Sequence, residues 1–188
     1  MTFLLDNLLG GVRLLGASAA FVFTAPVLIA LLLVPAAIRT YQLFRLDDSG
    51  WLEVVVEGLR VVLVVAMVLV GRGSPVSALF TAGWWGEVGR GIATAWRADW
   101  GGILVRLAVV TAIVLLFNAA VEALVTADRL AALPGPWRTD PAQADALRRA
   151  ATFAVKNAVV IPVYLAAMLG ASGVLGRAPA GAAEATAG

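Results

Sequence analysis

The sequence predicts an all-α integral membrane protein, a four-helix transmembrane bundle with an N-terminal amphipathic helix and a Trp-rich interfacial segment. Hydrophobic residues make up 61% of the chain and charged residues 14%, against about 45–50% and about 25% in soluble domains. A helix needs about 20 apolar residues to cross roughly 30 Å of hydrocarbon. Four apolar stretches approach that length, and they cover residues 14–38, 54–71, 103–125 and 151–176.

The N-terminal segment, residues 2–15, repeats its leucines at helical spacing while Asp6 and Arg13 fall on another side. This pattern predicts a short amphipathic helix in the headgroup plane, and a helical extension of the first span is the alternative. The first span holds 25 uncharged residues between Arg13 and Arg39, more than the roughly 7–15 apolar residues of a cleaved signal peptide. We therefore expect a retained span that bends near Pro26.

The second span is short for a membrane crossing. Only 11 uncharged residues separate Arg60 from Arg72, which corresponds to about 17 Å of helix. Either Arg60 and Glu57 enter the membrane, or the helix breaks at residues 71–75 and a second apolar piece, residues 76–85, completes the depth. A third possibility is that both arginines snorkel toward opposite surfaces.

Residues 72–102 are rich in glycine and tryptophan. Four tryptophans fall within 17 residues, at positions 84, 85, 96 and 100, and tryptophan favours the membrane–water interface. From Glu87 to Trp100 the pattern is weakly amphipathic. We interpret this segment as an interfacial helix that lies along one membrane face.

Glu53, Glu57 and Arg60 are spaced at i, i+4 and i+7 on the second span, so they project from one helix face. Glu57 could bind a proton or a cation whose occupancy is coupled to Arg60. The alternative, which we favour, is an i,i+3 ion pair that neutralises itself at the membrane boundary. An unpaired arginine at the centre of a span would cost about 2.5–3.5 kcal/mol.

The third span carries Arg106, Asn118 and Glu122, and one of the two charged residues must enter the hydrocarbon core or snorkel from it. Asn118 and Glu122 are four residues apart and share a helix face. If the third and fourth spans are antiparallel neighbours, Glu122 faces Lys156 and Asn157. We expect an interhelical salt bridge, which either locks the two helices together or forms a gated ion or substrate site; the locking role is favoured.

The fourth span follows a helix start at Asp140, places Lys156 at the membrane boundary and bends at Pro162. The four spans form one domain over residues 1–176. The tail, residues 177–188, consists mainly of alanine, glycine and proline and is predicted to be disordered.

The residue types exclude several classes of function. The chain has no cysteine and no histidine, so it lacks the usual ligands of metals and haem and the usual proton shuttle at neutral pH. Phosphate-binding loops, nucleophile elbows and paired-acid motifs are also missing. We therefore expect a protein that is not an enzyme and holds no cofactor or metal. Its basic residues are scattered, so no nucleic-acid partner is expected.

These observations predict an assembly or accessory subunit of a larger membrane complex, whose partners are the lipid bilayer and other membrane chains or further copies of itself. A small oligomeric transporter or channel for an ion or small solute is the alternative. The single lysine and the abundance of alanine, valine, leucine and glycine suggest a GC-rich genome, and hence a multi-pass protein of the bacterial plasma membrane. The basic residues of the loops mildly favour both termini outside the cell.

Overall fold

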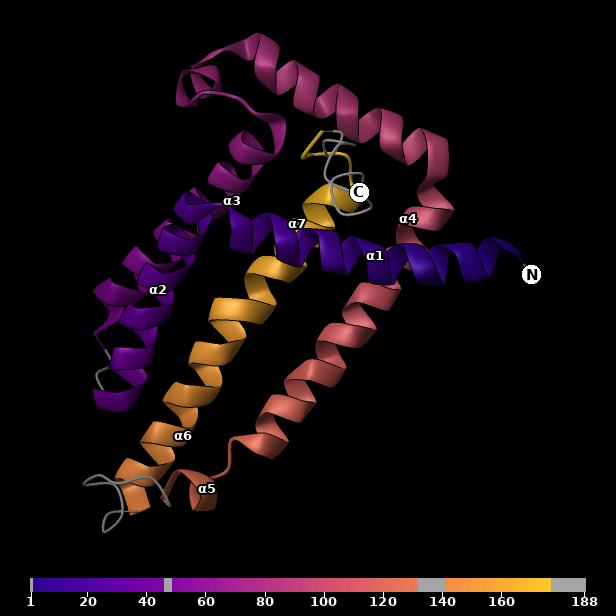
Figure 1. Cartoon of the computed structure of the whole chain (residues 1–188). Coiled ribbons are helices and arrows are strands. Elements are labelled where there is room, and N and C mark those ends of the chain that lie inside the picture. The colour runs from indigo at the N-terminus through magenta and orange to yellow at the C-terminus, as the bar shows by residue number, and fades with distance from the viewer. Residues whose placement is uncertain (1, 46–48, 132–140, 177–188) are drawn as a thin grey trace, which may run out of the picture.

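The computed structural model describes residues 2–45, 49–131 and 141–176. Within these residues every regular element is a helix (Figure 1), which confirms the all-α prediction. Five helical stretches among them are long and apolar enough to span a membrane, which indicates a multi-pass membrane protein in contact with lipid. The helix start predicted at Asp140 and the disorder predicted for residues 177–188 lie outside the described residues.

The predicted first span, residues 14–38, is two helices, α1 (Thr2–Thr24) and α2 (Pro26–Arg45). The bend expected near Pro26 is a break, because this proline has no N–H to continue the α1 ladder and occupies the first position of α2. The segment predicted as a separate amphipathic helix, residues 2–15, is the N-terminal part of α1. This division raises the number of candidate spans from the four predicted to five.

The helix α3 (Gly50–Arg72) begins earlier than the predicted second span and rises about 34 Å over its 23 residues. It is therefore long enough to cross without a second apolar piece. It ends at Gly73, which has a φ of 61° and donates its N–H to the Val70 carbonyl at 3.1 Å. This closure requires the left-handed conformation that glycine adopts easily, and it lies within residues 71–75, where one of the alternatives predicts a break.

A short 3₁₀ turn, η1 (Val76–Phe80), leads into α4 (Ala82–Leu124). The helix α4 kinks at Asp99, whose φ and ψ of −155° and 53° are not helical. The Asp99 Oδ1 atom accepts the backbone N–H three residues later at 3.0 Å and so caps the second half of α4. The first half, residues 82–98, is named the cross helix, because it runs across the end of the bundle in Figure 1, and the second half, residues 100–124, runs along the bundle.

The cross helix contains most of the predicted Trp-rich segment, which is helical as expected. Its inner side packs Trp84 and Val88 against Val68 and Leu69 of α3. The Trp84 Nε1 atom also donates a hydrogen bond of 3.0 Å to Ser74 Oγ. The cross helix therefore covers the end of α3 and is held there by both apolar and polar contacts.

The last part of the chain forms a rod of three consecutive elements. They are α6 (Pro141–Val155), a π-helical segment η3 (Lys156–Val160) and α7 (Ile161–Ala171), and a short helix α5 (Ala127–Ala131) precedes them. The predicted fourth span, residues 151–176, ends as a helix at Ala171. Beyond it Gly173 has a φ of 74° and closes the helix in the same way as Gly73 closes α3.

Helices α2, α3, the second half of α4 and the α6–α7 rod run alongside one another, whereas α1 runs across them (Figure 1). The main apolar core joins α1, α2, α3 and α7 and consists of Val22, Leu28, Leu32, Leu63, Met67 and Ala166. Toward its N-terminal end, α1 lies directly on α4, since a Cβ atom at Gly11 would be only 2.8 Å from Val109. The main core therefore lies where the C-terminal part of α1 meets α2, α3 and α7.

Candidate functional site

Two neighbouring side chains of η3 connect this segment to two different helices. Lys156 Nζ lies 2.5 Å from Glu122 Oε1 of α4, and Asn157 Oδ1 accepts a hydrogen bond of 2.7 Å from Arg60 Nη2 of α3. Arg60 also forms an ion pair with Glu57, one turn earlier on α3. These five residues are named the polar cluster, and they bring together five of the eight residues that the sequence singles out.

Pro162 accounts for the π-helical form of η3. It has no N–H for the carbonyl four residues earlier, and its ring would clash with that carbonyl in a regular α-helix. The Ile161 N–H bonds instead to the Lys156 carbonyl, five residues earlier, which widens this turn by one residue. The bend predicted at Pro162 therefore takes the form of a π segment, and such segments are frequent at functional sites.

The Glu57–Arg60 ion pair has the i,i+3 geometry expected from the sequence. The Glu57 side chain is 65% exposed and the Arg60 side chain 31%, so Glu57 faces outward while Arg60 reaches inward to Asn157. The contact with Asn157 could not be predicted from spacing, because it depends on how α3 and η3 are placed in the bundle.

Glu53 does not join the polar cluster, although it shares a helix face with Glu57. It forms an ion pair of 2.6 Å with Arg39 of α2, because the antiparallel α2 and α3 place the end of one beside the start of the other. Gln42, only 1% exposed, donates a hydrogen bond of 3.3 Å to the Ser49 carbonyl at the same end. Arg39 and Gln42 are not among the site residues predicted from the sequence, although two consecutive spans joined by a short connector are a signal for contacts at this end.

The salt bridge between Glu122 and Lys156 joins α4 to η3, as expected for antiparallel neighbours. Asn118, one turn away on α4, does not extend it, since its buried Oδ1 atom has no hydrogen-bond partner among the described residues. Two turns earlier on α4, Thr111 Oγ1 lies 3.2 Å from Tyr164 Oη of α7, a contact that was not predicted from the sequence.

Arg106 belongs to the kink of α4 and lies apart from the polar cluster. It forms an ion pair of 2.5 Å with Asp99, and its Nε atom donates to the Gly102 carbonyl at 3.0 Å. The side chain therefore runs back toward the start of this half of α4, which is the snorkelling geometry. Asp99, a capping residue directly before Trp100, is the sequence feature that could have located the kink.

The polar cluster leaves little room for a ligand. A cavity of about 20 Å³ is bordered by Arg60, Asn157 and Pro162, which is enough for about one water molecule. The described residues contain no group of three or more Cys, His, Asp or Glu side chains that could hold a metal ion. Within the cluster two carboxylates face two cations, and their contacts tie α3 and α4 to η3. This arrangement can neutralise the charges of both carboxylates and hold three helices in register.

Comparison of the chain with protein-family models, with curated proteins and with solved structures gives no match. Its function therefore has to be inferred from its own residues. The polar cluster, the small cavity beside it and the outward faces of the helices carry that inference.

Proposed function

We propose that this chain is a non-enzymatic assembly or accessory subunit of a larger membrane complex in the bacterial plasma membrane. The observation that carries the proposal is the outward face of α3. On this face Trp51, Val54, Val61 and Glu57 are between 64% and 73% exposed. Gly58 lies among them, with no atom within 4 Å of the position that a Cβ would take.

The position of Glu57 explains why a partner chain is expected on this face. Glu57 lies about 10 Å along α3 from Gly50, so its carboxylate is within the membrane when α3 crosses. A charged side chain that faces lipid at this depth is costly, and the ion pair with Arg60 still leaves the Glu57 side chain 65% exposed. A second membrane chain over this face would remove Glu57 from lipid, and Gly58 would let the two helices approach closely.

The alternative function, a small oligomeric transporter or channel, has weaker support. In the polar cluster each charge faces a counter-ion of the same chain. The cavity beside Arg60 and Asn157 has the volume of about one water molecule, which is far short of a path across the bundle. We therefore do not propose conduction through a single copy.

We infer that four helices cross the bilayer and that α1 and the cross helix lie along one of its faces. Four stretches run alongside one another, namely α2, α3, the second half of α4 and the α6–α7 rod, whereas α1 and the cross helix run across them (Figure 1). Four crossings place the N-terminus of α1 and the end of the rod on the same side of the membrane. Five crossings, with α1 as the fifth, would place them on opposite sides.

Single cysteines decide between four and five crossings, because the chain has no cysteine of its own. We expect Thr2→Cys and Gly176→Cys to react with a membrane-impermeant thiol reagent from the same side of sealed vesicles. Reaction from opposite sides would mean that α1 crosses the bilayer. Vesicles opened with detergent provide the control that both positions are reactive at all.

A photoactivatable thiol probe tests the proposed subunit role. Attached to Val54→Cys in native membranes, the probe is expected to capture one membrane chain, either a partner or a second copy, because the side chain lies on the outward face of α3. Leu116→Cys is the matched control, since Leu116 is 71% exposed on α4 but has no charged neighbour on its face comparable to Glu57. We expect the probe at this position to react mainly with lipid.

A further inference from the structure

An apolar groove follows the outside of the seam between α2 and the α6–α7 rod. It has a volume of about 480 Å³, and four of its lining residues are the alanines at positions 36, 37, 154 and 158. Leu33 and Phe44 are the first and last residues of α2 that line it, and α2 rises about 16 Å between them. The groove is therefore long and parallel to α2.

The lining of the groove favours a hydrocarbon chain as its occupant. Apart from Thr40 and Tyr41, all the residues that line it are alanine, leucine or phenylalanine, so the groove offers water few hydrogen-bond partners. Carbon atoms pack against such a surface at about 3.5–4.0 Å, and a single acyl chain extended along α2 fits both its length and its chemistry.

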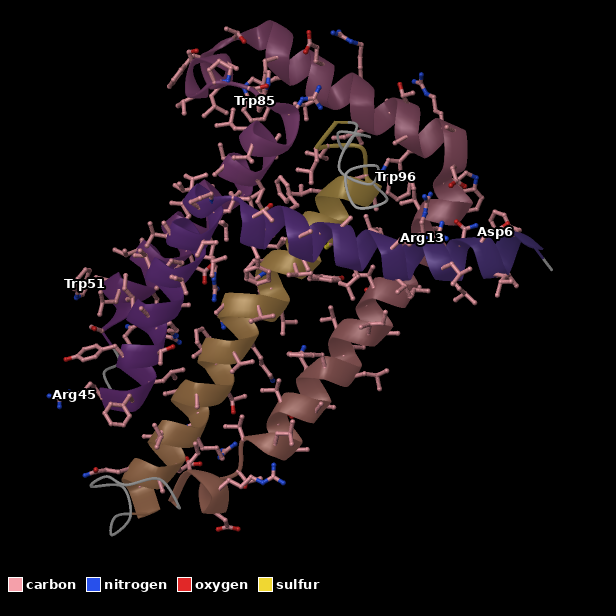
Figure 2. All side chains as sticks on the ribbon, viewed as in Figure 1. Asp6, Arg13, Arg45, Trp51, Trp85 and Trp96 are labelled. Carbon is pink, nitrogen blue, oxygen red and sulfur yellow. The ribbon has the colours of Figure 1, made fainter. Side chains whose placement is uncertain are left out.

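A cation directly follows the last residue of α2 that lines this groove. Arg45 directly follows Phe44, is exposed, and points away from the bundle at the end of α2 (Figure 2). It forms no ion pair with a described residue, whereas Arg39 is paired with Glu53 at 2.6 Å. Tyr41, 59% exposed, lies one turn before Arg45 and is a residue type that favours the headgroup level. Arginine binds phosphate through two parallel N–H donors.

We propose that a phospholipid occupies this groove, with one acyl chain along the alanines and its phosphate at Arg45. The lipid completes the surface of the bundle where the small alanine side chains leave α2 and the rod poorly covered. This binding is independent of the proposed subunit role, since a chain that associates with nothing could still retain the lipid.

Native mass spectrometry of the chain purified in a mild detergent tests the proposal. We expect about one phospholipid retained per wild-type chain. Most of it should be lost in the filled variant, a double substitution in which Ala37→Leu and Ala154→Leu together occupy the groove. Arg45→Met should reduce retention by about two- to fivefold, the worth of an exposed ion pair. Leu116→Ala, on the exposed face of α4, is the matched control and should retain the lipid as wild type does.

Two results would overturn the proposal. One is equal lipid retention by the wild type, the filled variant and Arg45→Met, which would mean that any retained lipid is bound elsewhere. The other is a copurified polypeptide that the filled variant loses while lipid retention is unchanged, which would assign the groove to a protein partner. Because Arg45 is exposed, Arg45→Met should fold normally and keeps the test decisive if the filled variant does not fold.

Discussion

Replacing Arg60 with methionine is expected to lower the free energy of unfolding by about 1.5–3 kcal/mol, the usual worth of a hydrogen bond to a charged group. The change removes the 2.7 Å bond to Asn157 Oδ1 and the ion pair with Glu57. Methionine retains a long, flexible apolar side chain, so the packing of α3 should be largely preserved. Denaturant unfolding in detergent micelles, followed by circular dichroism, measures the difference.

A double-mutant cycle isolates the contact between Arg60 and Asn157. Asn157→Leu alone should also destabilise the protein, and the two changes together should cost less than their sum by about 0.5–3 kcal/mol. Arg90→Met, on the exposed side of the cross helix, is the matched control and should change stability by less than about 0.5 kcal/mol. Strict additivity of Arg60→Met and Asn157→Leu would show that the polar cluster does not hold α3 to η3.

Replacing Gly11 with leucine is expected to lower the free energy of unfolding by about 1–3 kcal/mol through overpacking. A Cβ atom at Gly11 would lie 2.8 Å from Val109 and 3.1 Å from the Arg106 carbonyl oxygen. The carbonyl belongs to the backbone of α4 and cannot rotate away, so α1 must shift or leave the bundle. Thermal unfolding in lipid nanodiscs, where α1 keeps its membrane surroundings, measures the effect.

Gly16→Leu provides the opposite case on the same helix. No atom lies within 4 Å of a Cβ at Gly16, and glycine is about 1 kcal/mol less favourable in a helix than a good helix former. This variant should therefore leave stability unchanged or raise it. Equal losses for Gly11→Leu and Gly16→Leu would mean that α1 does not pack on α4 as described.

The helical class and most of the span positions could be predicted, because long apolar runs at this density have few other solutions. The apolar runs do not show, however, where a helix ends and the chain changes direction. Residues 14–38 form one uninterrupted apolar stretch, so only the proline at its centre marks the place where α1 ends and α2 begins. The kink at Asp99 likewise depends on a local cap. It lies close to the junction of two elements that the sequence predicts separately, the Trp-rich segment and the third span, which the structure joins in one kinked helix.

The candidate site divides in the same way between local and long-range contacts. The Glu57–Arg60 pair follows from helical spacing, and the Glu122–Lys156 pair follows from placing two consecutive spans antiparallel. The contact between Arg60 and Asn157 joins helices far apart in sequence and depends on the wider turn at η3. No periodicity in the chain predicts such a contact. Asn118 is the opposite case: helical spacing places it on the same face as Glu122, yet its Oδ1 atom has no hydrogen-bond partner among the described residues.

The central claim is that the outward face of α3 binds another membrane chain. The most direct measurement is the yield of photo-crosslinked protein from a probe at Val54→Cys, with and without Gly58→Leu. Gly58 has open space where its side chain would be, so leucine there should leave this chain folded but keep a partner helix at a distance. We predict a several-fold loss of capture on adding Gly58→Leu, and capture that is absent from the start, or unchanged by this substitution, would contradict the claim.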